Sequence, residues 1–125
     1  MPETAEKVLT VEQRPGAVVV RVQLRRLFLD AAQAFREELL QIAREVDSDV
    51  VVDLSAVNVM NSSALGALIL ASDTLRKRGR KLVLTNPGPV LRQVLARMKL
   101  DTILTIVPSV EEALAEISGE APSHS

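Results

Sequence analysis

The apolar residues of this chain switch repeatedly between two spacings, and this switching constrains the fold more than any other feature. In residues 17–24 every second residue is apolar (Val18, Val20, Val22 and Leu24), and these side chains would share one face of a strand. From Asp30 the spacing becomes helical, at Phe35, Leu39, Ile42 and Val46. The continuous apolar run at residues 50–54 indicates a strand covered on both faces. Strands that alternate with helices predict an α/β fold.

These patterns predict the element order ββαβαβαβα. The expected strands are residues 8–12, 17–24, 50–54, 81–85 and 103–107. The expected helices begin near Asp30, Asn61, Val90 and Ser109, with Asp30 and Ser109 as N-caps and Gly79 as the end of the second helix. The turn at Pro15-Gly16 predicts an antiparallel hairpin at the edge of an otherwise parallel, and therefore mixed, sheet.

The helical spacing also predicts which side chains are buried and where the domain ends. The second helix is expected to bury Leu65, Leu68, Ile69, Ser72 and Leu75. The third is expected to bury Val90, Leu91, Val94, Leu95 and Met98. A single domain is expected over residues 8–117, with flexible termini at 1–7 and 118–125.

Composition excludes most kinds of enzyme. The sequence has no cysteine, and its one histidine, His124, lies in a polar tail, which removes thiolate chemistry, histidine-based triads and the common metal sites. The net charge of −1 provides no positive electrostatic field to attract nucleic acid. The absence of Trp and Tyr leaves no aromatic surface on which bases could stack. No apolar stretch is long enough to span a membrane, and the N-terminus does not resemble a signal peptide, so a cytoplasmic protein is expected.

The strongest candidate site is the junction Asn61-Ser62-Ser63, which follows the strand ending at Asp53. In an open α/β sheet, functional groups collect where strands turn into helices. Free N–H groups and the positive end of the helix dipole would stabilise a phosphate esterified to Ser62. The small residues Ala64, Gly66 and Ala67 leave room for a close approach. A purely structural alternative remains, in which Asn61 caps the helix and the small residues only pack it against the sheet.

At this point the sequence resembles the STAS domain family, named after sulfate transporters and anti-sigma factor antagonists. The resemblance rests on Val50-Val51-Val52-Asp53-Leu54-Ser55, Asn61-Ser62-Ser63-Ala64-Leu65-Gly66 and the basic turn and strand Arg76–Leu84. It continues weakly through Pro89–Leu95 and Leu100–Leu104. The resemblance implies a STAS-like fold and a non-enzymatic, bacterial regulator of transcription without a cofactor of its own.

In the anti-sigma factor antagonists of this family, the first serine of the junction is phosphorylated by a serine kinase that is also the anti-sigma factor. The unmodified domain binds the kinase, and the phosphorylated domain releases it. By position, the resemblance implies phosphorylation at Ser62. It also implies partner contacts at Asn61, Ser63, Ala64, Gly66 and Asp30.

The sequence departs from the family pattern at three points. Asn61 replaces an acidic residue, Ala64 replaces a glycine, and the glycine of the Gly-x-Leu-Asp motif before the first helix is absent, leaving only Leu29 and Asp30. Two other roles therefore stay open, both without phosphorylation: a STAS subunit of an ABC-type transporter and a subunit of a stressosome-like scaffold.

Two further patterns favour structural interpretations. The basic cluster Arg76, Lys77, Arg78, Arg80 and Lys81 complements the dipole at a helix C-terminus, and an acidic partner is its functional alternative. Asn86-Pro87-Gly88-Pro89 is typical of a turn that enters a helix. The free edge of the first strand leaves a homodimer open.

Overall fold

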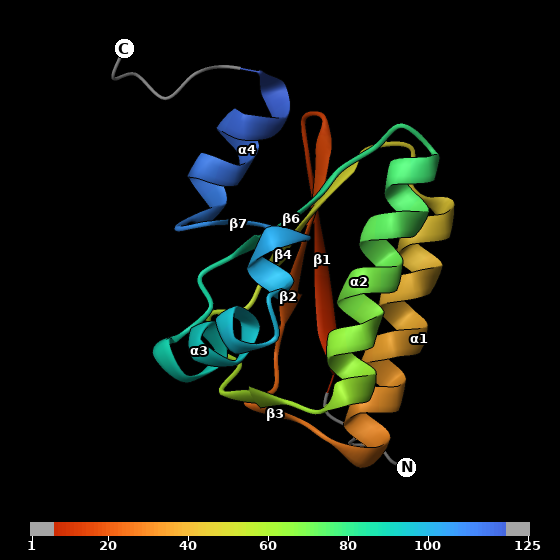
Figure 1. The fold of residues 1–125 in the computed structure, drawn as a ribbon. Coiled ribbons are helices and arrows are strands. Elements are labelled where there is room, and N and C mark those ends of the chain that lie inside the picture. The colour runs from red at the N-terminus through yellow and green to blue at the C-terminus, as the bar shows by residue number, and fades with distance from the viewer. Residues whose placement is uncertain (1–6, 120–125) are drawn as a thin grey trace.

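The computed structural model describes residues 7–119 and confirms the predicted element order (Figure 1). The strands are β1 (Leu9–Arg14), β2 (Ala17–Val22), β3 (Arg26–Leu27), β4 (Asp49–Asp53), β5 (Val59–Met60), β6 (Leu82–Thr85) and β7 (Thr105–Val107). The helices are α1 (Leu29–Glu45), α2 (Ser62–Lys77), α3 (Pro89–Arg97) and α4 (Val110–Ser118), with a 3₁₀ turn at Leu100–Thr102. Residues 1–6 and 120–125, including His124, lie outside the described residues, so the expected flexibility of the termini stays a prediction there.

The main sheet has the order β1-β2-β4-β6-β7, in which β1 and β2 pair antiparallel and the other neighbours pair parallel. The hairpin turns at Gly16, whose φ of 79° is easily adopted by glycine. Alternate side chains of each central strand face opposite ways, so Val50 and Val52 belong to the larger core and Val51 to the smaller one. The sheet therefore separates two apolar layers.

Different helices pack on the two faces of the sheet (Figure 1). α1 and α2 lie side by side and, with α3, supply Phe35, Leu39, Leu68, Leu75, Leu91 and Leu95 to the larger core. α4 covers the other face with Val110 and Ala113, which pack against Val19, Val51 and Val83. Because α4 has only nine residues, it covers only part of this face. No helix within residues 7–119 combines the length and the apolar character that a membrane crossing requires.

A second, two-stranded parallel sheet lies outside the five strands predicted from the sequence. In it Arg26 pairs with Val59 and Leu27 with Met60. The main-chain N–H of Asn61 donates to the carbonyl oxygen of Leu27 at 3.0 Å. This ladder joins the segment before α1 to the segment before α2, so the two helices begin close together.

Several local predictions were wrong. Asp30 is not an N-cap: α1 begins at Leu29, its N-cap residue is Phe28, and no side chain caps the helix. Val90 and Met98 of α3 are exposed because that helix packs only through one narrow face. Ile103 is 62 % exposed and precedes β7, since the chain first makes the 3₁₀ turn. In α2, Ser72 is only half-buried, and the alanines at 64, 67 and 71 complete the buried stripe.

Candidate functional site

Ser62 is the first residue of α2, and its side chain is exposed. Asn61 precedes it as the N-cap: its side-chain oxygen accepts a hydrogen bond from the N–H of Ala64 at 3.0 Å. Within residues 7–119, the hydroxyl of Ser62 and the N–H groups of Ser62 and Ser63 have no hydrogen-bond partner. The positive end of this 16-residue helix therefore presents free donors beside an accessible hydroxyl.

The surroundings of Ser62 come from α1 as well as α2. Arg36 reaches across from α1, and its Nη1 donates to the carbonyl oxygen of Ser63 at 3.3 Å. The same nitrogen lies 3.5 Å from the place where a Cβ on Gly66 would stand, an ordinary contact distance, so Arg36 lies directly against Gly66. Ser63 and Gly66 are half-buried, whereas Ala64 is fully buried in the larger core. Direct contacts with a partner would therefore come from the neighbours of Ala64.

The start of α1 adds an exposed apolar rim to this region. Phe28 is 43 % exposed and Leu29 is 85 % exposed. Leu29 has a φ of 52°, in the left-handed region that a leucine rarely occupies. Asp30 is exposed in the first turn of α1, three residues after Leu27, whose carbonyl oxygen ties the ladder to Asn61. The ladder thus places Asp30 at the same end of the helix pair as Ser62, although no hydrogen bond joins the two side chains.

Asp53 lies on the other face of the sheet from α2. Its side chain points the same way as Val51, toward the layer that holds α4, whereas Val52 and Leu54 face the larger core. Asp53 and Ser62 belong to one candidate segment of the sequence. The structure separates the two side chains, because a strand residue and a helix that packs on the opposite face cannot meet through the sheet.

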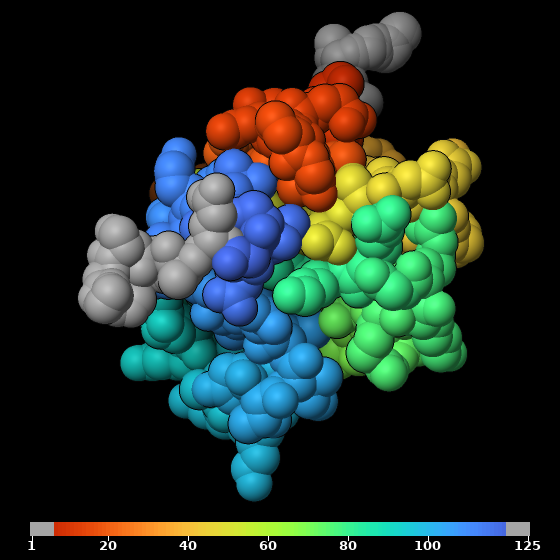
Figure 2. Space-filling model, turned by 90° about the horizontal axis from the view of Figure 1, so that it is seen from above, coloured from red at the N-terminus to blue at the C-terminus, as the bar shows by residue number. Residues whose placement is uncertain are grey.

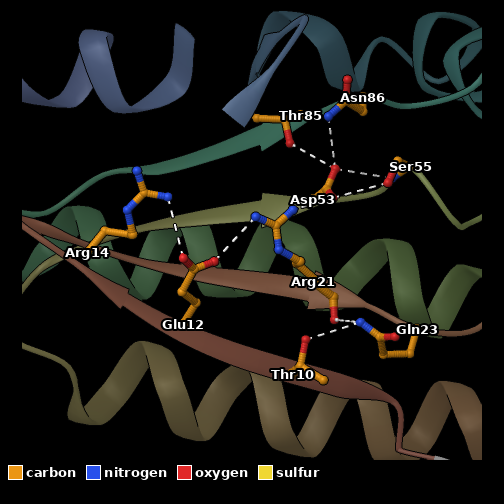
Figure 3. A network of polar contacts seen from close by, with 9 residues as sticks. All are labelled: Thr10, Glu12, Arg14, Arg21, Gln23, Asp53, Ser55, Thr85 and Asn86. Atoms are coloured by element: carbon orange, nitrogen blue, oxygen red, sulfur yellow. Dashed lines mark hydrogen bonds and ion pairs between the residues drawn. The ribbon is translucent and has the colours of Figure 1, made fainter. Parts of the chain in front are cut away.

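Asp53 is instead the centre of a polar network across the strand ends (Figure 3). Its Oδ1 accepts hydrogen bonds from Asn86 Nδ2 at 3.0 Å, Thr85 Oγ1 at 3.2 Å and the Ser55 N–H at 3.3 Å. Its Oδ2 accepts from Ser55 Oγ and from Arg21 Nη1, both at 3.1 Å. The network continues outward, since Arg21 also contacts Glu12 at 3.3 Å and Glu12 contacts Arg14 at 3.5 Å.

The network explains the charge state of Asp53, which is only 6 % exposed. Burial alone would raise the pKa of the Asp53 carboxyl, because it removes water from the charged form. Hydrogen bonds from Asn86, Ser55 and Thr85 outweigh burial and lower the pKa below its ordinary value. Asp53 is therefore an ionised structural residue whose acceptor sites are occupied.

This lowered pKa predicts how stability depends on pH. Because the folded-state pKa is below the unfolded one, the contribution of Asp53 is fully present above the unfolded pKa of about 4 and is lost as the pH falls further. We expect the free energy of unfolding to decrease below about pH 4. In Asp53→Asn this decrease should be smaller, which urea titrations at several pH values would measure. Identical pH profiles for the two proteins would contradict the assignment.

Most cations of the basic cluster have structural partners. Arg76 and Lys77 form ion pairs with Asp73, and Arg78 donates to the carbonyl oxygen of Ala43 at 2.8 Å. Lys77, through its hydrogen bond, also lowers the pKa of Asp73. Arg80 and Lys81 are different: their side chains form no ion pair or hydrogen bond with any described residue.

The segment Asn86–Pro89 combines its expected turn role with a role in the network. Gly88 is the N-cap residue of α3 and Pro89 its first residue, as the turn interpretation predicted. Asn86 has a φ of 58° and directs its side-chain amide at Asp53. Neither this role nor that of Arg21 was predicted from the sequence, because both depend on which strands are neighbours in the sheet.

Comparison with known proteins agrees with the resemblance seen in the sequence. The family model of the STAS domain matches residues 8–113. An anti-sigma factor antagonist from Mycobacterium paratuberculosis is similar in structure, with 24 % identity, a TM-score of 0.78 and coverage of 88 % of this chain and 92 % of that one. The phosphorylated form of the Bacillus cell fate determinant SpoIIAA is 20 % identical, with a TM-score of 0.65 and coverage of 87 % and 98 %.

A protein of a different kind is also similar. The murine anion transporter Solute Carrier 26 family member A9, in its inward-facing state, matches with 18 % identity and a TM-score of 0.69. The match covers 83 % of this chain but only 18 % of the transporter.

Proposed function

Because this chain belongs to the STAS domain family, we propose that it is a regulatory interaction module of the anti-sigma factor antagonist type, switched by phosphorylation of Ser62. Its partner is a serine kinase that is also the anti-sigma factor, and the kinase carries the ATP and Mg²⁺. The unmodified domain binds the kinase in the cytoplasm, and phosphorylation releases it. The chain itself catalyses no reaction and uses residues 8–117 as the binding domain, without nucleic acid and without insertion into a membrane.

The exposed, unpartnered hydroxyl at the start of α2 is the observation that carries this proposal. A kinase can transfer a phosphoryl group only to a hydroxyl that it can reach, and Ser62 meets this requirement. Asn61, Ser63 and Gly66 are its neighbours in the first turns of α2, and Asp30 lies in the first turn of α1; these four residues are the candidate partner contacts. The Bacillus protein that has been determined in a phosphorylated form supports the same use of the fold.

The position of Ser62 also indicates how the switch works. A phosphate at the N-terminus of a helix interacts favourably with the dipole and the free N–H groups, so the modified domain should stay folded. In a tight protein contact, however, the same dianion must be desolvated or paired. Phosphorylation should therefore weaken partner binding without unfolding the domain.

We expect Ser62→Asp to weaken binding to the cognate kinase at least about tenfold, which corresponds to roughly 1.4 kcal/mol. Ser62→Ala should bind like the wild type, because it adds no charge. Gln93→Glu adds one negative charge on an exposed position of α3 and serves as the matched control. Calorimetric titration gives the affinities, and thermal unfolding checks that every variant is folded.

Equal affinities of the wild type and Ser62→Asp would argue against the switch. A similar loss in Gln93→Glu would show that net charge, and not position, controls binding. A loss of affinity accompanied by a large fall in the unfolding temperature would point to damage of α2 instead.

The likeness to the anion transporter favours a second candidate function, as a STAS subunit of a transport machine, for example of the ABC type. In this role the domain would dock without being phosphorylated. Co-purification distinguishes the two functions, because a transporter ATPase and a small serine kinase differ in size and in sequence. A stressosome-like scaffold would instead appear as a very large assembly in size-exclusion chromatography.

A further inference from the structure

A groove runs along the outer side of α2, between this helix and the segment that leads into β7. Its apolar part is lined by Ile69, Leu70 and Ile103, and its polar part by Asp73 and Arg76. We call this surface the α2 groove, and its volume is about 370 Å³. Figure 2 shows α2, in green, and the light blue segment before β7 on the same face of the molecule. The groove begins at Gly66, one turn beyond Ser62.

The apolar part exposes two large aliphatic side chains. Leu70 is 40 % exposed and Ile103 is 62 % exposed, and both line the groove. The two residues come from distant parts of the sequence, so the fold brings them together. The N–H of Ile103 donates to the carbonyl oxygen of Leu100 at 3.0 Å, which fixes the turn that presents this side chain. Covering such paired apolar side chains would remove them from water at a favourable free energy.

The other end of the groove is basic. An adjoining hollow shares Ser72, Arg76 and Ile103 with the groove and is also lined by Arg80, Lys81, Leu82 and Thr105. The carboxylate of Asp73 already pairs with Arg76 and Lys77. Arg80 and Lys81 have no ion-pair partner among residues 7–119 and are exposed. Apolar side chains and cations without an ion-pair partner among the described residues therefore adjoin each other on this surface, with Ile103 lining both hollows.

We propose that the α2 groove binds an acidic amphipathic helix of a protein partner. The apolar face of that helix would cover Leu70 and Ile103, and its acidic end would pair with Arg80 and Lys81. A nucleic acid fits less well, because its bases would meet aliphatic side chains with no aromatic ring for stacking in a chain of net charge −1. This inference does not rest on the Ser62 switch, since it uses neither the serine nor a phosphate.

The probe is a synthetic helical peptide of roughly 18 residues, with leucines along one face and glutamates at one end. A second peptide carries lysines in place of the glutamates. We expect the acidic peptide to shift the NMR signals of Leu70, Arg80 and Ile103. The double variant Arg80→Glu/Lys81→Glu should weaken its binding at least about tenfold, measured by fluorescence anisotropy. The double variant Arg92→Glu/Arg97→Glu, on exposed positions of α3, should bind within a factor of about two, as the matched charge control.

A second variant tests the apolar part independently. Ile103→Glu should also weaken binding of the acidic peptide about tenfold, and circular dichroism checks its folding. If Ile103→Glu does not fold, the binding measured for the double variant Arg80→Glu/Lys81→Glu is the test of the proposal. Signal shifts confined to other surfaces, equal binding of the lysine peptide, or binding of a DNA oligonucleotide or an anionic vesicle without the acidic peptide would each overturn the proposal. None of these results bears on the Ser62 assay, which uses the kinase.

Discussion

Replacing Asp53 with alanine is expected to lower the free energy of unfolding by about 3 kcal/mol. The five hydrogen bonds that its carboxylate accepts come from β2, from the end of β6 and from the loops after β4 and β6. Their loss would leave Thr85, which is 0 % exposed, with a buried hydroxyl that has lost its acceptor. Asn86 would lose the interaction that holds its left-handed backbone in place.

Urea denaturation followed by circular dichroism measures this effect. Asp73→Ala is the matched control, because Asp73 also forms two ion pairs but lies on an exposed helix surface. Exposed ion pairs contribute little to stability, so this control should lower the free energy of unfolding much less than Asp53→Ala does. Similar effects of the two substitutions would mean that the buried network contributes no more than surface charges do.

The order of the elements could be predicted because each major element has its own periodicity. The valines of β2 and β4 and the helical spacing of Phe35 and Leu39 carry enough signal to define the layers. Asn61 and Ser109 could be predicted as N-caps because this role depends on nearby residues, and both side chains accept the expected hydrogen bond. β3 and β5 could not be predicted, since two-residue strands have no periodicity and form only when distant loops meet.

At the candidate site, too, features set by local sequence could be predicted and features set by the tertiary fold could not. The position of Ser62 at the start of a helix followed from local sequence. The separation of Asp53 from Ser62 depends on which face of the sheet α2 covers. Alternation alone places Asp53 with Val51, but it does not say which helix packs there. The Asp53 network also needs the register Arg21–Asp53–Thr85 across three strands, which is set by the tertiary fold.

The second large effect is expected at Leu27, a fully buried residue of the small β3–β5 sheet. Leu27→Ala should lower the free energy of unfolding by about 3 kcal/mol, because it removes packed methyl groups and leaves a cavity. The buried side chain fixes β3, and the carbonyl oxygen of Leu27 itself accepts the hydrogen bond from the N–H of Asn61 at 3.0 Å. The substitution should therefore also loosen the position of Ser62 relative to the start of α1.

Leu40→Ala separates the two effects of this substitution. Leu40 is 9 % exposed, belongs to the same core and lies in the C-terminal half of α1, away from the ladder. Urea denaturation should give comparable losses of stability for both variants. Calorimetry at a temperature where both are folded should show weaker kinase binding only for Leu27→Ala. If kinase binding weakens equally in both variants, it depends on the stability of the core and not on the ladder. If binding weakens in neither variant, the ladder does not set the geometry that the partner recognises.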